Sequence, residues 1–213
     1  MHHRSLESAD VQAETPVGDD RDCLIDAAFY CLSHPELGPA SIAAMLARAG
    51  VSARVFYRYF VSKDELFLAM LTQENNALVG RLDDIAADTA VAPAVALESW
   101  IIEMFERVED PVRARRSAVL MTDEVRAARG YREFRCHADS ARHRSLVQIL
   151  TRGRQDKSFP VTDPAADAVS IDAVCDHAVS NLIARNTGKP GFGVAHVVGF
   201  ALRSLGAVRS SGG

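Results

Sequence analysis

Apolar side chains recur at intervals of three and four residues along most of the chain, and proline or glycine marks the breaks. The first such run holds Ile25, Ala28, Phe29 and Leu32, at positions i, i+3, i+4 and i+7. That spacing places apolar side chains on one face of a helix. Runs of β-branched residues are short and aromatic residues are few, which favours helices over sheets. The sequence therefore predicts an all-α protein.

The breaks divide this pattern into a series of segments. Each break contains proline, glycine or a short polar stretch, which is typical of turns between helices. The longest apolar runs are far too short to cross a bilayer, so no membrane contact is expected. The predicted helices span approximately residues 21–33, 42–49, 53–60, 62–88, 93–110, 111–129, 131–157, 164–186 and 192–208.

The second and third of these helices have recognisable ends. Ser41 and Ser52 stand where an N-cap hydroxyl is preferred. Gly50 closes the second helix as a residue that is free to take a positive φ. A short helix, a tight glycine-containing turn and another short helix, preceded by a supporting helix, are the organisation of a helix-turn-helix unit.

The third helix carries aromatic side chains and arginines together. At 100° per residue, Phe56 and Phe60 lie close together on its surface and are expected to face the core. Arg54, Tyr57 and Arg58 point largely away from them. The pattern therefore predicts two buried rings that anchor the helix, and an outward face that holds two guanidinium groups and a phenol.

The fourth helix begins with its own signal. Ser62 and Glu65 fit the S-x-x-E capping box, in which two side chains satisfy free N–H groups at a helix start. Lys63 lies in the first turn, where free N–H groups and the helix dipole favour a phosphate.

Composition and charge exclude few classes of protein. The 213 residues carry a formal net charge of −4, so whole-chain charge does not indicate a nucleic-acid partner. Residues 21–65 hold five Lys or Arg and five Asp or Glu, which predicts modest nonspecific affinity and a shallow salt dependence for any DNA binding. The four cysteines form no C-x-x-C pair and no apolar leader is present, so a cytoplasmic protein is expected.

Residues 21–70 resemble the N-terminal DNA-binding domain of the TetR family of transcriptional repressors. The matching pieces are "LIDAA" in the first helix, "SIAAMLARAGVS" through the second helix and the turn, "FYRYF" in the third helix and "SKDEL" at the start of the fourth. The resemblance covers about a quarter of the chain. It implies a larger, all-helical second domain whose last two helices form a dimer interface.

The resemblance also implies roles for individual residues. It matches Ala53, Arg54, Val55, Tyr57 and Tyr59 to recognition-helix positions that approach bases or phosphates, and Ser41 and Lys63 to positions that contact the DNA backbone. Ser52 and Arg58 complete the predicted DNA-binding set. Chemistry agrees for several of them, because an arginine can reach guanine O6 and N7 and a valine can touch a thymine methyl. A tyrosine hydroxyl and a lysine suit phosphates.

This sequence also departs from the family pattern. Small residues are common in the family where Arg54 stands, so Arg54 either changes the base preference or contacts phosphate. The second helix often carries basic residues near Ala43 and Ala44, and here it does not. The N-terminal arm is acidic, which weakens the case for minor-groove contacts.

The larger domain offers candidates for a ligand pocket, although stripes of such residues are more often simply core. An arginine-rich run between Arg126 and Arg144 is either a solvated helix face or an attraction for an anionic effector such as a carboxylate or an acyl thioester. Glu133 lies four residues before His137, but too few partners accompany them to predict a metal site. The candidate pocket residues are Trp100, Met104, Phe105, Met121, Phe134 and His137.

The last two predicted helices carry apolar faces that suit either a dimer interface or burial within one chain, and the resemblance favours the dimer. No catalytic signature such as G-x-S-x-G or H-E-x-x-H occurs, so an enzyme is not expected, and neither a cofactor nor a metal is predicted. The residues proposed for the dimer face are Ala173, Val174, Ala178, Leu182, Val197, Phe200, Ala201 and Leu205.

The sequence thus predicts a homodimeric, ligand-responsive regulator that binds double-stranded operator DNA. A repressor that a small-molecule effector releases is favoured over an activator, an effector-independent regulator or an all-helical enzyme. The expected organisation is a flexible arm (1–20), a helix-turn-helix domain (21–66), a helical effector-binding and dimerisation domain (67–208) and a flexible tail (209–213).

Overall fold

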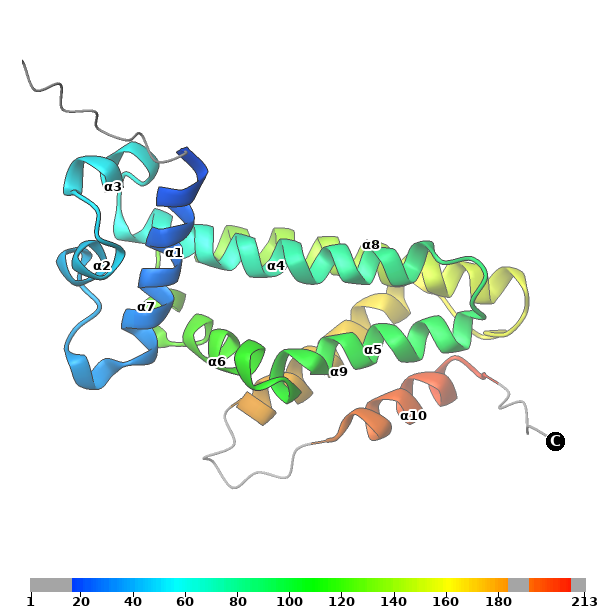
Figure 1. The fold of residues 1–213 in the computed structure, drawn as a ribbon. Coiled ribbons are helices and arrows are strands. Elements are labelled where there is room, and N and C mark those ends of the chain that lie inside the picture. Colours follow the sequence, from blue (N-terminus) through cyan, green and yellow to red (C-terminus); the bar gives the residue numbers. More distant parts are fainter. Residues whose placement is uncertain (1–16, 184–191, 208–213) are drawn as a thin grey trace, which may run out of the picture. The chain divides into compact units, whose positions relative to one another are not determined.

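The computed structural model describes residues 17–183 and 192–207, and within these ranges the chain is helical, without strands (Figure 1). The all-α prediction is therefore confirmed. The described residues divide into two compact units at the junction of Ser62 and Lys63. The helices are α1 (Val17–Ser33), the 3-10 turn η1 (Pro35–Leu37), α2 (Ile42–Ala49), α3 (Ala53–Tyr59), α4 (Lys63–Ala87), α5 (Pro93–Glu109), α6 (Pro111–Leu120), α7 (Asp123–Arg126), α8 (Tyr131–Gln155), α9 (Pro164–Ile183) and α10 (Val194–Ser204).

The N-terminal unit consists of α1, η1, α2 and α3, and its turns follow the predicted chemistry. The Ser41 hydroxyl accepts a hydrogen bond from the Ala44 amide at 3.2 Å, and Ser52 caps α3 in the same way. Gly50 ends α2 with φ 69°, in the left-handed region that glycine adopts without a Cβ penalty. The caps and the glycine together make the tight turn between α2 and α3.

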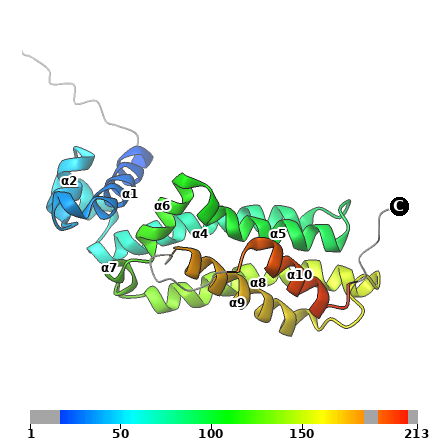
Figure 2. The same cartoon turned by 90° about the horizontal axis from the view of Figure 1, so that it is seen from below.

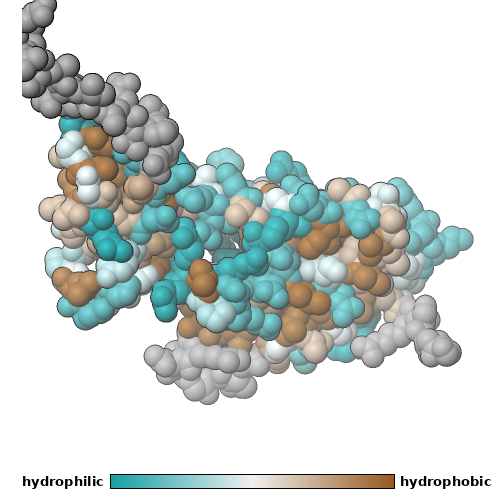
Figure 3. Space-filling model, in the orientation of Figure 1, coloured by the Kyte–Doolittle hydropathy of each residue, from teal (hydrophilic) through white to brown (hydrophobic). Residues whose placement is uncertain are grey.

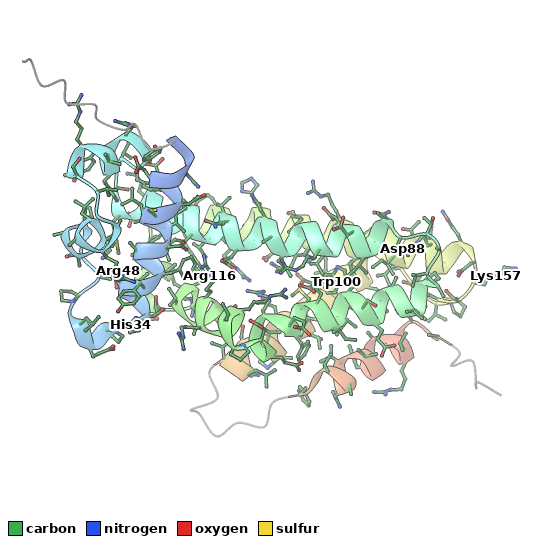
Figure 4. All side chains as sticks on the ribbon, viewed as in Figure 1. His34, Arg48, Asp88, Trp100, Arg116 and Lys157 are labelled. Atoms are coloured by element: carbon green, nitrogen blue, oxygen red, sulfur yellow. The ribbon has the colours of Figure 1, made fainter. Side chains whose placement is uncertain are left out.

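The core of this unit is small and apolar. Leu24, Ile25, Met45 and Phe56 are fully buried, and they come from all three α-helices. At its edge, the Arg48 guanidinium of α2 lies 3.9 Å from the centre of the Tyr30 ring of α1, a cation–π contact. The same ring stacks on His34, which Figure 4 labels beside Arg48.

The C-terminal unit is a bundle built from α4 to α10. Figure 2 shows α8, α9 and α10 on one side of α5, and α4 packs against both α5 and α8. Its core is centred on α5, where Trp100, Ile101 and Met104 are completely buried. The Trp100 indole N–H donates to the Ser145 hydroxyl at 2.9 Å, so the largest buried ring has its polar atom satisfied.

The structure differs from the expected element boundaries at three helices. Helix α10 (Val194–Ser204) is shorter than the helix expected over 192–208. Helix α1 begins at Val17, four residues before the expected start. The helix expected over 111–129 is broken, because Thr122 takes an extended backbone conformation between α6 and α7. The Thr122 hydroxyl donates to the Val119 carbonyl at 2.8 Å instead of capping α7, and Asp123 and Glu124 place two acidic residues in the first turn of α7, where the helix dipole favours them. Residues 1–16 and 208–213, which include most of the expected arm and tail, lie outside the described residues.

The face expected to form a dimer is mostly core in a single chain. Ala178, Val197, Ala201 and Leu205 are buried in the C-terminal unit, and Val174 and Leu182 pack against the same cluster. Sequence periodicity identified apolar faces, but it could not tell which faces the neighbouring helices of the same chain would cover. Ala173 and Phe200 remain exposed.

None of the helices in residues 17–183 and 192–207 combines the length and apolar character that a membrane span requires.

Two glycines inside helices should respond oppositely to alanine. A Cβ at Gly153 of α8 would lie 2.0 Å from the Phe159 ring, which is fully buried, whereas a Cβ at Gly80 of α4 meets nothing within 4 Å. Gly153→Ala should therefore lower the thermal midpoint through overpacking that costs about 1–3 kcal/mol. Gly80→Ala should leave it unchanged or raise it, because alanine is the better helix former. Calorimetry of both variants checks this, and equal midpoints would contradict the packing described.

Candidate functional site

The exposed face of α3 holds the polar side chains expected there. Arg54, Tyr57 and Arg58 are exposed, and the Tyr57 side chain has a relative exposure of 59%. Ala53 is exposed too, and its small side chain lets another surface approach the start of the helix. Val55 is only partly accessible, so it lies at the border between the core and this face.

Two buried phenyl rings anchor α3 in the core of the N-terminal unit. Phe56 and Phe60 are 0% and 2% exposed, and their ring centres lie 5.7 Å apart. The Arg21 guanidinium of α1 lies 5.7 Å from the centre of the Phe60 ring, which adds a contact on the N-terminal side. Because the rings are fixed, the face that carries Arg54 and Tyr57 has a defined direction. Tyr59, also predicted as a contact, is half-buried and packs at a tilt on Phe60.

The two capping serines remain capable of an outward contact. Each uses its hydroxyl oxygen to accept a backbone amide proton, from Ala44 for Ser41 and from Val55 for Ser52. Both residues are exposed, and a hydroxyl that accepts one bond still has its own hydrogen to donate. A phosphate oxygen is a suitable acceptor for such a hydrogen.

Lys63, the first residue of α4, has an internal partner that the sequence did not reveal. Its ammonium group forms an ion pair with Glu124 of α7 and lies 5.2 Å from the centre of the Phe67 ring. The two partners are 61 residues apart in the chain, and no local pattern predicts such a pair. In this conformation the lysine charge is therefore offset within the C-terminal unit.

The C-terminal unit encloses a cavity of about 80 Å³ between α4, α5, α6, α8 and α9. Its apolar lining side chains include Leu78, Leu120, Met121 and Phe134. Its charged lining side chains are five arginines and two carboxylates. Figure 3 shows polar side chains gathered over the face of this unit between α4 and α5. The charged lining residues are Arg81, Arg107, Arg113, Arg135, Arg142, Glu74 and Asp176.

Of the six residues predicted for a ligand pocket, two line this cavity and the other four lie elsewhere. Met121 and Phe134 line this cavity. Trp100, Met104 and Phe105 instead belong to the closed core of the unit and line none of the described cavities. Figure 4 shows Trp100 on α5, inside the bundle. An apolar stripe alone does not distinguish a pocket wall from a core.

His137, the last of the six, is exposed and lines a shallow groove between α4 and α8. One of its ring nitrogens, Nδ1, is 2.8 Å from the carbonyl oxygen of Glu133 in its own helix. In the described part of the chain, no group of three or more His, Cys, Asp or Glu side chains is placed to hold a metal ion.

Two of the cavity arginines lie in a region that the sequence pattern had marked. Arg135 and Arg142 belong to the basic run in α8, which the periodic pattern left open as either a solvated face or an anion attraction. Arg142 is 2% exposed, and its Nε donates to Asp172 at 2.9 Å. Burial opposes its charge, but the hydrogen bond to Asp172 and the carboxylates of Asp172, Asp139 and Asp176 outweigh burial and raise the pKa of Arg142.

Arg107, like Arg81 and Arg113, lies outside the basic run that the sequence pattern singled out. It lies near the end of α5 and lines the cavity. Burial lowers the pKa of Arg107, and the positive charges of Arg142 and Arg135 lower it further, against the opposing carboxylates of Asp176 and Asp172. Burial first, and the charge of Asp172 next, raise the pKa of the Cys175 thiol of α9 to about 12, which disfavours its thiolate form.

Comparison with known proteins agrees with this geometry. Residues 24–70 match the family model described as bacterial regulatory proteins of the tetR family. The match includes α2, α3 and the start of α4, the segment that carries the exposed arginines and the capped turn. No protein with a curated description matches the chain.

Solved structures share the fold of the whole chain at low sequence identity. A transcriptional regulator from Rhodococcus sp. Rha1 is 22% identical, with a TM-score of 0.68 over 88% of this chain and 97% of that one. The regulator FadR from Bacillus subtilis, in complex with stearoyl-CoA, is 17% identical, with a TM-score of 0.67 over 86% and 96%. A complex of SmeT, a repressor from Stenotrophomonas maltophilia, with triclosan is 18% identical, with a TM-score of 0.70 over 90% and 93%.

Proposed function

We propose that this chain, a DNA-binding regulator with a TetR-family helix-turn-helix domain, represses transcription by binding a pseudo-palindromic operator as a homodimer. A small molecule that enters the cavity of the C-terminal unit releases the operator. The observation that carries the proposal is the outward face of α3, where two arginines and a tyrosine stand on a helix fixed by buried phenyl rings.

The dimensions of α3 explain why two copies are needed. A helix of seven residues offers only a few side chains to base edges, so one copy specifies little more than a half-site. A two-fold dimer presents two such helices to successive major-groove faces one helical turn apart. The exposed apolar side chains on α9 and α10, including Val169, Ala173 and Phe200, support a dimer through these helices.

The cavity supports ligand response. The solved structures with stearoyl-CoA and with triclosan are of proteins with the same fold. Occupancy of the cavity can shift a conformational equilibrium only by a differential affinity for two forms. Met121 lies in the cavity wall and ends α6, directly before α7. A ligand that holds this segment in place would therefore keep Glu124 paired with Lys63 and withhold the lysine charge from DNA.

The experiment that tests the proposed function is a titration of the purified protein against the DNA that flanks its own gene, with random DNA as competitor at a stated salt concentration. Preferential binding to one site is expected. A reporter under the same promoter should rise when the gene is deleted if the protein represses, and fall if it activates. Binding to random DNA with equal affinity would reject the proposal.

Alanine substitutions on α3 should separate base reading from phosphate contact. Arg54→Ala should change base preference at one operator position, with a loss of about 1–3 kcal/mol at guanine. Tyr57→Ala should weaken binding to all operator variants about equally, because a phosphate contact carries no base information. Arg154→Ala, on an exposed site of α8, is the matched control and should change nothing. A uniform loss from Arg54→Ala would show that Arg54 does not read a base.

Release of Lys63 from its partner should increase DNA affinity. In Glu124→Gln the lysine charge becomes available to a phosphate, and the slope of log K against log salt should steepen by about 0.9 for each added phosphate contact. Asp123→Asn changes the net charge by the same amount one residue away and is the control. Fluorescence anisotropy over a salt series measures both. Identical slopes for the two variants would mean that the Lys63–Glu124 pair does not restrain DNA binding.

The dimer can be tested on the exposed residues of the last two helices. Ala173→Glu and Phe200→Asp should produce monomers at concentrations where the wild type is dimeric, because each would bury an unpaired carboxylate in the interface. Ala77→Glu, on an exposed position of α4, should leave the dimer intact. Light scattering after size-exclusion chromatography measures the masses. A dimer that persists in both interface variants would place the contact elsewhere.

A further inference from the structure

We infer that the cavity of the C-terminal unit binds a small organic acid, a molecule with one carboxylate and an apolar remainder, and that Arg107 is the group that binds the carboxylate. The inference rests on the proposed function in taking this cavity as the effector site. It adds the chemical class of the effector and the residue that selects it.

The first argument is the distribution of ion pairs around the cavity. Arg81 and Arg113 both pair with Glu103. Arg135 reaches a carboxylate oxygen of Asp176 at 3.3 Å. Each of these lining arginines is therefore already matched by an acidic side chain of the same unit.

Arg142 is matched even more fully, because it pairs with Asp172 at 2.9 Å and with Asp139 at 2.7 Å. Arg107 alone among the five lining arginines makes no hydrogen bond or ion pair with its side chain in the part of the chain that the structure describes. It is the one lining guanidinium whose donors remain open to a ligand.

The second argument is electrostatic. Arg107 is partly buried beside two other guanidinium groups, and both burial and those charges disfavour its charged form. A bound anion reverses this situation, since an opposite charge at contact distance favours the cation. A carboxylate also matches the planar fork of a guanidinium with two parallel hydrogen bonds. The unoccupied site is thus the less favourable state for Arg107, and an acid stabilises it.

The third argument limits the charge and the shape of the ligand. The carboxylates of Glu74 and Asp176 also line the cavity, and they would repel a second negative charge on a ligand. Apolar side chains also line the cavity, among them Leu120 and Phe134. A ligand with one charged end and an apolar body can contact both kinds of lining side chain, whereas an inorganic dianion has no apolar part to offer.

The size of the cavity points to a small acid, or to a larger one that displaces part of the wall. About 80 Å³ is well below the volume of a pocket for a drug-sized ligand, which is on the order of 300–1,000 Å³. A groove at the surface shares Met121, Tyr131, Arg135 and Asp176 with the cavity lining, and it gives an access route beside the α6–α7 break.

The test measures the thermal midpoint of the full chain with benzoate and hexanoate at millimolar concentration, and with benzamide and hexanamide as neutral analogues of the same shape. The acids should raise the midpoint by about 2–4 °C for each kcal/mol of binding free energy, and the amides should not. Sulfate at matched ionic strength controls for a general salt effect. Equal shifts from acids and amides, or no shift from either acid, would overturn the inference.

Substitutions of Arg107 test whether this residue binds the carboxylate. Arg107→Met should remove the response to the acids and should leave the midpoint of the unliganded protein unchanged or higher, because it removes an unpaired, partly buried cation. Arg107→Lys keeps the charge without the fork and should retain a weaker response. Arg115→Gln changes an exposed arginine of α6 outside the cavity and should respond as the wild type does. A full response in Arg107→Met would overturn the assignment.

A separate measurement distinguishes this inference from the proposed function. If the acids bind through Arg107 but leave DNA occupancy unchanged in an anisotropy assay, the site stands and ligand-controlled release is wrong. If the protein binds its operator and acids have no affinity for it, the regulator stands and the acid site is wrong.

Discussion

The burial of Phe56 and Phe60 is the constraint on which the function of the N-terminal unit depends. A seven-residue helix is too short to be stable alone, so α3 depends on the burial of Phe56 and of its C-cap residue Phe60 in a core made with α1 and α2. The same burial fixes which residues are left outside. Arg54, Tyr57 and Arg58 are exposed because the helical period places them opposite the rings. The burial of these two rings therefore stabilises the unit and also sets the direction of the face that we propose reads DNA.

The C-terminal unit shows the reverse situation, in which charge is buried and has to be matched. Burial of Arg142 is tolerated because its guanidinium forms ion pairs with both Asp172 and Asp139. The attraction in such close pairs offsets the free energy that is lost when the charges leave water. Arg107 lacks such a partner at the same cavity, and the acid proposed as effector would supply it. The break between α6 and α7 at Met121 connects the cavity wall to Glu124, and through Glu124 to Lys63. We propose that binding of an acid at Arg107 acts through the α6–α7 segment on the ion pair between Glu124 and Lys63.

Sequence alone predicted the N-terminal unit in detail, because its signals are local. Capping serines, a left-handed glycine and two rings four residues apart act within one or two turns, and the structure confirms the caps at Ser41 and Ser52, the turn at Gly50 and the buried faces. For the C-terminal unit, the sequence predicted where the helices lie along the chain but not how they pack against one another. Whether Trp100 lines a pocket or fills a core depends on which helices cover α5, and no local pattern contains that information. The Lys63–Glu124 pair and the unmatched Arg107 depend on residues tens of positions apart, so the sequence did not reveal them either.

Hydroxyl-radical footprinting of the protein on the DNA upstream of its own gene tests the central claim, that the exposed face of α3 reads a DNA groove, most directly. The account predicts two protected segments on one face of the duplex, with centres one helical turn or a multiple of it apart, and loss of both segments in Tyr57→Ala. Uniform, weak protection along the fragment, or an unchanged footprint in that variant, would contradict it.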